Sequence, residues 1–238
     1  MDDLTDKVAI ITGAGGSVGS ALTRIFLEKG VKTVLLYRSD KHKEKLSGLI
    51  NEYDTSVLTV QGDLNDMSFA ERAVNEAVNH FNRIDFMINP IGGWIGGKRL
   101  HDHSWDELEK MLSIDVKPTF NLLRAVLPVM VEQQFGKIIN FSSMAAFGTG
   151  TNTAVYAASK AAVTQLTDSV AHEYGAENIQ AFAIAPSTID TEANRNAMPD
   201  ADTSTWVSLD EIADAVLYLC TSGDSLSGTV LKFTGKII

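Results

Sequence analysis

The stretch Val8-Ala-Ile-Ile-Thr-Gly-Ala-Gly-Gly-Ser-Val-Gly19 decides how the chain folds. Its first four residues are apolar, as in a buried strand, and glycines then dominate up to Gly19. In the following segment, Leu22, Ile25 and Phe26 have helical spacing. A strand that passes through a glycine turn into a helix lets backbone N–H groups and the positive end of the helix dipole approach a pyrophosphate. The stretch therefore predicts the start of an α/β fold with an anion-binding turn.

Apolar runs alternate with amphipathic stretches along the rest of the chain. This alternation predicts a Rossmann-type, doubly wound parallel sheet of about seven strands with helices on both faces. The length of 238 residues fits one domain, 1–238. We expect strands over 7–12, 32–37, 56–61, 84–89, 136–142, 179–184 and 229–233, and helices near 17–30, 41–53, 67–82, 104–133, 153–174 and 209–221.

The spacing of Ser143, Tyr156 and Lys160 is the strongest indication of chemistry. Tyr156 and Lys160 are four residues apart, so they share one face of the helix expected over 153–174. A nearby ammonium favours the phenolate and lowers the tyrosine pKa, which makes Tyr156 a candidate general acid or base. Ser143 follows an apolar strand and can hydrogen-bond the same substrate oxygen. The three residues predict chemistry at a carbonyl or alcohol.

Charge and composition restrict the partners. The chain has 20 basic and 30 acidic residues, a net charge of −10, and no basic block, so we expect no nucleic acid partner. The N-terminal segment lacks an apolar signal region and no apolar run is long enough to span a bilayer, so we expect a cytoplasmic protein with no membrane partner. The single cysteine, Cys220, falls in a helical apolar pattern and is expected in the core.

His101 and His103 do not predict a metal site. Residues two apart do not share a helix face, and no further histidine or cysteine lies nearby in the sequence, so we expect no metal. We expect two solvated loop histidines, followed by a helix that starts with a capping box of Ser104 and Glu107.

The segment 187–207 lacks clear periodicity. It is too long for an ordinary connection, and we interpret it as a mobile substrate lid. A plain surface excursion is the alternative.

Taken in order, these motifs resemble those of short-chain dehydrogenases/reductases, over essentially the whole chain. The resemblance implies an NAD(P)-dependent oxidoreductase that reduces a small-molecule carbonyl to an alcohol, or the reverse. It implies that Tyr156 is the acid/base, that Lys160 lowers its pKa and holds the nicotinamide ribose, and that Ser143 positions the substrate oxygen. The matching motifs are Thr12 to Gly19, Gly62 to Leu64, Asp85 to Gly92, Ser143, Tyr156, Lys160 and Pro186 to Thr191.

The end of the second expected strand bears on the choice of cofactor. Tyr37 stands where NAD enzymes usually place an acid for the ribose 2′-hydroxyl, and Arg38 follows, so NADP(H) is favoured over NAD(H). Relatives often carry a second basic residue inside the glycine turn, where this chain has Gly16, and Arg38 as a merely solvated side chain is the alternative. The implied cofactor-binding residues are Gly13, Gly15, Ser17, Val18, Gly19, Arg38, Ser39, Asp63, Leu64, Asn89, Pro90, Gly92, Tyr156, Lys160, Pro186, Ile189 and Thr191.

Several positions depart from the family pattern, including Gly235-Lys236 in place of the family's usual Gly-Gly. Ser17 replaces a glycine of the turn, and Pro90 removes a backbone donor after the fourth expected strand. Asp115 stands where the family has an asparagine that supports a proton relay. We treat Asp115 as a further candidate catalytic residue whose carboxylate, if ionised near Lys160, raises the pKa of that lysine.

Other functions are left open by the sequence. The segments from Gly92 to Gly97 and from Thr188 to Asp202 resemble dihydropteridine reductases, in which case Trp94 could stack on a flat ring. That branch prefers NADH and lacks the serine, which conflicts with Arg38 and Ser143. A non-catalytic nucleotide-binding sensor or scaffold is an alternative of another class. The resemblance also implies a homodimer or homotetramer built on the two long helices.

Overall fold

The fold is a seven-stranded parallel sheet between two layers of helices. The computed structural model describes residues 4–148, 150–221 and 224–236. The strands lie in the order β3-β2-β1-β4-β5-β6-β7, and every pairing is parallel, which confirms the expected doubly wound sheet. The strand bounds agree with the expected ones to within two residues: β1 Val8–Ile11, β2 Lys32–Tyr37, β3 Val57–Gln61, β4 Phe86–Asn89, β5 Gly136–Phe141, β6 Ile179–Pro186 and β7 Val230–Phe233.

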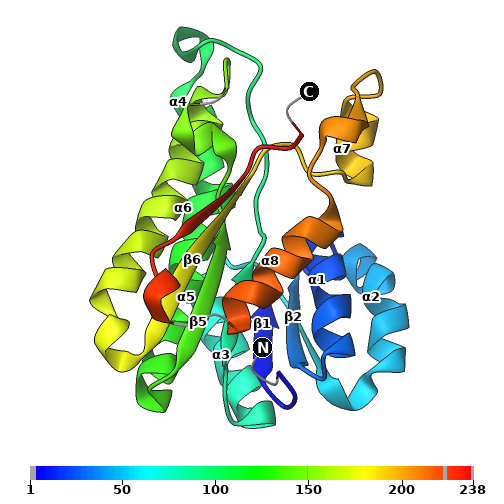
Figure 1. The fold of residues 1–238 in the computed structure, drawn as a ribbon, viewed down its shortest axis with the longest axis vertical. Coiled ribbons are helices and arrows are strands. Elements are labelled where there is room, and N and C mark those ends of the chain that lie inside the picture. The colour runs from blue at the N-terminus through cyan, green and yellow to red at the C-terminus, as the bar shows by residue number, and fades with distance from the viewer. Residues whose placement is uncertain (1–3, 149, 222–223, 237–238) are drawn as a thin grey trace.

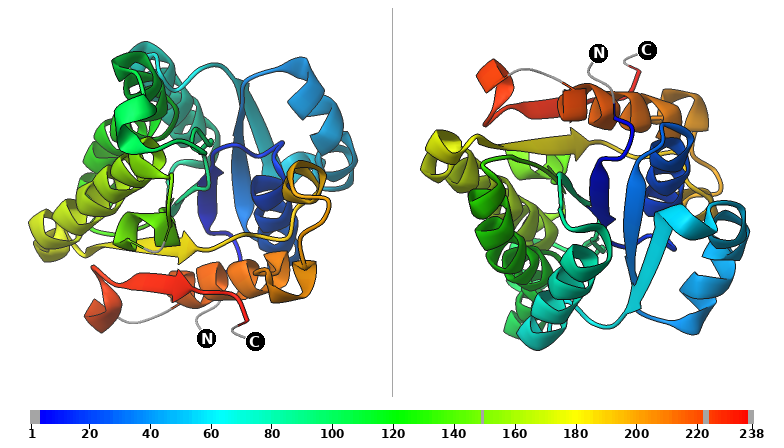
Figure 2. Two further views of the ribbon diagram at one scale, coloured as in Figure 1. Left: turned by 90° about the horizontal axis from the view of Figure 1, so that it is seen from above. Right: turned by 90° about the horizontal axis from the view of Figure 1, so that it is seen from below.

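Helices cover both faces of the sheet (Figures 1 and 2). One hydrophobic core lies under α1, α2 and α8, and the other lies under α3, α5 and α6. Cys220 of α8 is buried in the first core as expected, and burial raises the pKa of its thiol. The α-helices are α1 Ser17–Glu28, α2 Asp40–Glu52, α3 Met67–Phe81, α4 Trp105–Met111, α5 Lys117–Gln133, α6 Ala154–Glu173, α7 Glu192–Ala197 and α8 Leu209–Thr221.

The helix expected over 104–133 is confirmed as a continuous helical stretch, but it is not α-helical throughout. A π-helical turn, Leu112–Val116, separates α4 from α5. Pro118 explains the interruption, because it has no N–H to donate to the carbonyl of Ile114, as an α-helix would require. The widened turn contains Asp115, which is completely buried. Single π-helical turns occur frequently at functional sites, which directs attention to Asp115.

The capping box before α4 is confirmed, but one of the two histidines is not solvated. The Ser104 hydroxyl accepts a hydrogen bond from the Glu107 N–H, and the Glu107 carboxylate accepts one from the Ser104 N–H. Glu107 also lies 3.1 Å from Nδ1 of His103, whose side chain is only 2% exposed. The expectation of a solvated loop residue is therefore wrong for His103, whereas His101 is exposed.

The segment 187–207 contains the short helix α7 and is closed at its base. Ile189 and Val207 form an isolated parallel bridge, the Asp190 N–H donates to the Val207 carbonyl over 2.8 Å, and the Val207 N–H donates to the Thr188 carbonyl over 2.9 Å. Figure 1 shows α7 above the ends of α1 and α2, to one side of the sheet. Movement of this segment as a substrate lid stays a prediction.

Within residues 4–148, 150–221 and 224–236, no helix combines the length and the apolar character that crossing a bilayer requires.

A buried carboxylate joins the amino ends of β1 and β4. The side chain of Asp85 is fully buried and accepts hydrogen bonds from Arg83 Nε over 2.8 Å and from Arg83 Nη2 over 2.6 Å. It also accepts the N–H of Val8 over 2.9 Å, and Lys7 Nζ lies 3.4 Å away. Asp85 therefore fixes β1 next to β4. The glycine turn follows β1, and the loop that contains Pro90 and Gly92 follows β4.

We expect Asp85→Ala to lower the free energy of unfolding by about 3 kcal/mol, because it leaves a buried backbone N–H and a guanidinium without their acceptor. Urea denaturation followed by circular dichroism measures the change. Glu76→Ala removes the exposed Arg72–Glu76 ion pair and serves as the control, with an expected loss below about 0.5 kcal/mol. Equal losses in the two variants would contradict the assigned role of Asp85.

Candidate active site

The residues singled out from the sequence gather at the carboxyl ends of the central strands. The glycine turn follows β1, Asn89 ends β4, and Ser143 comes two residues after β5. Tyr156 and Lys160 lie in the first two turns of α6, which packs against β5 and β6. In open α/β sheets this edge, where the strand order reverses, is the place at which ligands bind.

Ser143 and Tyr156 are in contact through their side chains. A hydrogen bond between the two hydroxyls lowers the pKa of Tyr156, but burial is the larger influence and raises that pKa, and the charge of Asp115 raises it further. The net direction is opposite to the one expected from Lys160. Ser143 is itself buried, accepts the Ala145 N–H over 3.2 Å and points at the Pro186 carbonyl from 3.4 Å.

The Lys160 ammonium is buried, and the groups around it accept hydrogen bonds from it or carry a negative charge. Its side chain is 5% exposed, Nζ donates to the Phe141 carbonyl over 3.0 Å, and Nζ lies 3.4 Å from Oδ1 of Asp115. Burial lowers the pKa of Lys160, and the Asp115 carboxylate opposes that fall. The predicted effect of Asp115 on this lysine is therefore confirmed in its direction.

Asp115 is held in place by further hydrogen bonds. Its Oδ1 accepts the N–H of Gly93 over 3.2 Å, and its Oδ2 accepts the hydroxyl of Ser159 over 2.6 Å. Ser159 was not singled out from the sequence, although its place directly before Lys160 could have suggested a supporting role. The carboxylate thus links the loop after β4, the π-helical turn and α6.

Gly92 leaves room for this ion pair. A Cβ atom added at Gly92 would lie 2.6 Å from Nζ of Lys160 and 3.1 Å from Oδ1 of Asp115. Both distances are shorter than a van der Waals contact, so any side chain here displaces the ammonium. Gly92 was expected to contact the cofactor, and the structure gives a second reason for a glycine at this position.

A buried chain of side-chain hydrogen bonds runs behind the site. The Asn89 amide accepts the Thr12 hydroxyl over 2.7 Å and donates to Thr119 and to Asn140, each over 2.9 Å. Asn140 in turn donates to Thr167 over 3.0 Å. The side chain of Asn89 is 1% exposed and fixes the ends of β1, β4 and β5, and its expected contact with a cofactor stays a prediction.

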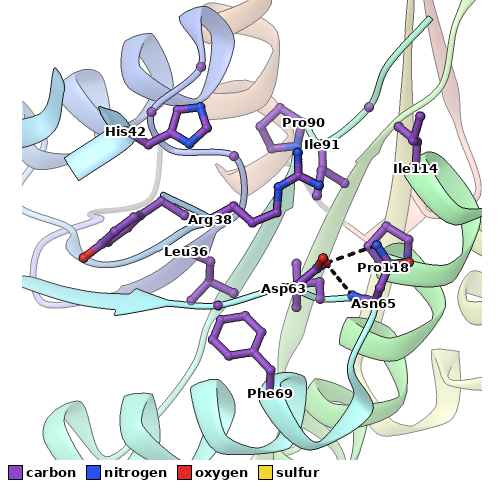
Figure 3. Close-up of a pocket in the computed structure, with 17 residues that line it drawn as sticks. Leu36, Arg38, His42, Asp63, Asn65, Phe69, Pro90, Ile91, Ile114 and Pro118 are labelled. Carbon is purple, nitrogen blue, oxygen red and sulfur yellow. Dashed lines mark hydrogen bonds between the residues drawn. The ribbon is translucent and has the colours of Figure 1, made fainter. Parts of the chain in front are cut away.

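A cavity of about 280 Å³ opens beside the glycine turn (Figure 3). Seven of the expected cofactor residues line it: Gly13, Gly15, Arg38, Asp63, Leu64, Pro90 and Gly92. Other lining residues were not expected from the sequence, among them His42, Asn65, Phe69, Ile114 and Pro118. The remaining expected residues are not part of this lining: Ser17, Val18, Gly19, Ser39, Asn89, Tyr156, Lys160, Pro186, Ile189 and Thr191.

The cavity suits a dinucleotide with a pyrophosphate at the start of α1. The N-cap residue is Gly16, which presents no side chain, and the first turn of α1 contains no acidic residue. Gly13 has a φ of +54°, a conformation that glycine adopts without strain. Arg38 lines the cavity and makes none of the ion pairs found within the described part of the chain. The residues present therefore fit an extended anion.

Ile189 and Thr191, which were expected to bind the cofactor, make hydrogen bonds within the segment after β6. The Ile189 carbonyl accepts the Asn194 side-chain amide over 2.8 Å, and Thr191 caps α7 by accepting the Asn194 N–H over 3.2 Å. Their proposed contact with a cofactor stays a prediction.

The exposed indole of Trp94 lies beside Tyr156, the candidate general acid. The rings of Trp94 and Tyr156 meet edge to face, with centroids 4.8 Å apart, yet Trp94 is 59% exposed. A Cβ atom added at Gly96 would lie 2.5 Å from the indole, so this glycine makes room for it. The Gly97 N–H donates to the Asn152 carbonyl over 2.8 Å and ties the Trp94 loop to the start of α6. Trp94 thus offers a flat apolar surface next to the Tyr156 ring.

Comparisons with known proteins agree with this geometry. The family model for short chain dehydrogenases matches residues 7–202. An uncharacterized oxidoreductase of Staphylococcus aureus (strain MW2) is 33% identical over 224 residues, which cover 93% of this chain and 94% of that protein. Levodione reductase superimposes with a TM-score of 0.89 at 28% identity, covering 98% of this chain and 97% of the other. NAD⁺-bound xylitol dehydrogenase superimposes with a TM-score of 0.90 at 25% identity, covering 99% of this chain and 100% of the other.

We expect Gly92→Ala to weaken the binding of NADPH and NADH at least about tenfold, because the new methyl group displaces an ammonium whose hydrogen bonds contribute about 1.5 kcal/mol or more each. Cofactor fluorescence titration measures both affinities. Gly48→Ala in α2 is the matched control, since an added Cβ there has no neighbour within 4 Å. Unchanged binding in Gly92→Ala would contradict the link between this glycine and Lys160.

Proposed function

The chain belongs to the short chain dehydrogenase family, and from that premise we propose that it reduces a small-molecule carbonyl to an alcohol with NADP(H), or catalyses the reverse reaction. The observation that carries the proposal is the buried cluster in which the Tyr156 hydroxyl bonds to Ser143 while the Lys160 ammonium is paired with Asp115. When bound, the nicotinamide ring supplies or accepts the hydride.

In the reductive direction, Tyr156 donates its proton to the substrate oxygen. Burial and the charge of Asp115 raise its pKa, which favours the protonated phenol. The protonated phenol is the form that a proton donor needs. Ser143 donates a hydrogen bond to the same oxygen and stabilises the negative charge that develops there.

Asp115 acts by positioning Lys160. With its oxygens engaged by Gly93, Ser159 and Lys160, the carboxylate holds the ammonium under the loop after β4. From there Lys160 can bind the nicotinamide ribose, as the family resemblance implies. In this proposal the carboxylate supplies a fixed charge at the position where the family uses a neutral amide.

Arg38 supports a preference for the phosphorylated cofactor. It lines the cavity beside the glycine turn, and its neighbour Tyr37 leaves no carboxylate at the end of β2 to repel a 2′-phosphate. A guanidinium binds phosphate through two parallel hydrogen bonds.

A dihydropteridine-like reductase is the second candidate. The exposed indole of Trp94, held 4.8 Å from the ring of Tyr156, favours a substrate with a flat ring. The presence of Ser143 next to Tyr156 favours the carbonyl reductase. It also weighs against a non-catalytic nucleotide sensor, which has no need of this hydroxyl pair.

The proposal includes assembly into a homodimer or homotetramer in the cytoplasm. A largely apolar groove runs between α5 and α6, and Phe120 within it is 50% exposed. Such a surface suits the outer faces of two helices that meet a second copy. Its lining includes Leu112, Val116, Phe120, Ala162 and Leu166.

We expect the purified protein to oxidise NADPH faster than NADH in the presence of at least one member of a panel of ketones, quinones, acyl thioesters and quinonoid dihydropterin. Tyr156→Phe should lower that turnover by at least about 10²-fold, the usual contribution of a general acid, while binding NADPH with unchanged affinity. Absorbance at 340 nm measures turnover and fluorescence measures binding. Turnover that survives in Tyr156→Phe would rule out the assigned proton donor.

A further inference from the structure

We propose that His42, at the start of α2, is a specificity-determining residue that donates a hydrogen bond to the 2′-phosphate of NADP(H). The inference rests on the proposed preference for that cofactor. The glycine turn cannot provide a second basic side chain beside Arg38, because residues 15 and 16 are both glycine. His42 lines the same cavity as Arg38 and comes from a different element.

The glycine turn and His42 share one space. A Cβ atom added at Gly15 would lie 2.5 Å from Cβ of His42 and 2.9 Å from its Cα. The start of α2 can therefore pack against the turn only because residue 15 has no side chain. His42 takes the volume that a side chain of the turn would otherwise fill.

The imidazole is oriented by the residue that precedes α2. The Ser39 hydroxyl lies 3.1 Å from Nδ1 of His42, and the His42 N–H donates to the Ser39 carbonyl over 2.9 Å. When Ser39 donates to Nδ1, the ring hydrogen is on Nε2, which then remains a donor. Within the described part of the chain, Nε2 has no hydrogen-bond partner and His42 is half-buried. Nε2 is thus available to a ligand in the cavity.

Arg38 and His42 together form a site for a phosphate. Both residues line the cavity, and in the view of Figure 3 the Arg38 guanidinium lies near Pro90 and Ile91 with His42 to one side of it. A phosphate monoester can accept hydrogen bonds from the guanidinium and the imidazole at once. A cofactor with a free 2′-hydroxyl leaves at least one of the two donors unused, so the pair discriminates between NADP(H) and NAD(H).

Calorimetric titration with 2′,5′-ADP and with 5′-AMP tests the inference, because the two probes differ only by the 2′-phosphate. We expect His42→Ala to weaken the binding of 2′,5′-ADP at least about tenfold and to leave that of 5′-AMP unchanged, in line with the loss of one hydrogen bond to a charged group. His42→Lys should recover most of the loss. Lys43→Ala, which removes an exposed cation from the same turn of α2, should change neither affinity.

The outcomes separate this inference from the proposed function. A specific loss in Arg38→Ala with no loss in His42→Ala would overturn the role of His42 and leave the preference for NADP(H) standing. Equal weakening of both probes in His42→Ala would assign His42 a purely structural role and overturn the inference. If the unmodified protein binds 2′,5′-ADP no more tightly than 5′-AMP, the preference for NADP(H) and the role of His42 both fall.

Discussion

The burial of one ammonium group is the constraint on which the candidate active site depends. Lys160 is a charged side chain with 5% exposure, and removing such a group from water costs several kcal/mol unless partners compensate. The partners come from separate parts of the fold: the Phe141 carbonyl ends β5, and Asp115 lies in the π-helical turn. Gly92 in the loop after β4 has no side chain that could push them apart. The ion pair thus depends on three parts of the fold together: the end of β5, the π-helical turn and the loop after β4.

Buried hydrogen bonds connect the cavity beside the glycine turn with the ion pair of Lys160 and Asp115. Asn89 joins Thr12 at the glycine turn to Thr119 of α5, whose hydroxyl donates to the Asp115 carbonyl over 2.6 Å. A fully satisfied buried network of this kind fixes its members in one arrangement. The glycine turn and the carboxylate that holds Lys160 are therefore positioned by one set of hydrogen bonds.

Much of the fold could be predicted from sequence, because apolar runs and the glycine turn are local signals. The seven strands follow from such signals, and the placement of Ser143 near Tyr156 follows from the motif spacing and the family resemblance. The π-helical turn at Leu112–Val116 was not predicted, although Pro118 signals it, because helical periodicity continues on both sides. The raised pKa of Tyr156 and the burial of His103 depend on neighbours distant in sequence or on packing, which no spacing rule reports. His42 was missed because its contact with Gly15 exists only in three dimensions.

The pH dependence of kcat/KM for carbonyl reduction by Asp115→Asn shows whether the Asp115 charge sets the electrostatics of the site. The Asp115 carboxylate raises the pKa of both Tyr156 and Lys160, so its replacement by a neutral amide lowers both. Activity at high pH is lost when either group gives up its proton. We expect the alkaline fall in kcat/KM to move to lower pH in Asp115→Asn and to stay in place in Asp168→Asn, which changes an exposed carboxylate of α6. If the alkaline fall stays in place or moves to higher pH in Asp115→Asn, the Asp115 charge does not set the electrostatics of the site.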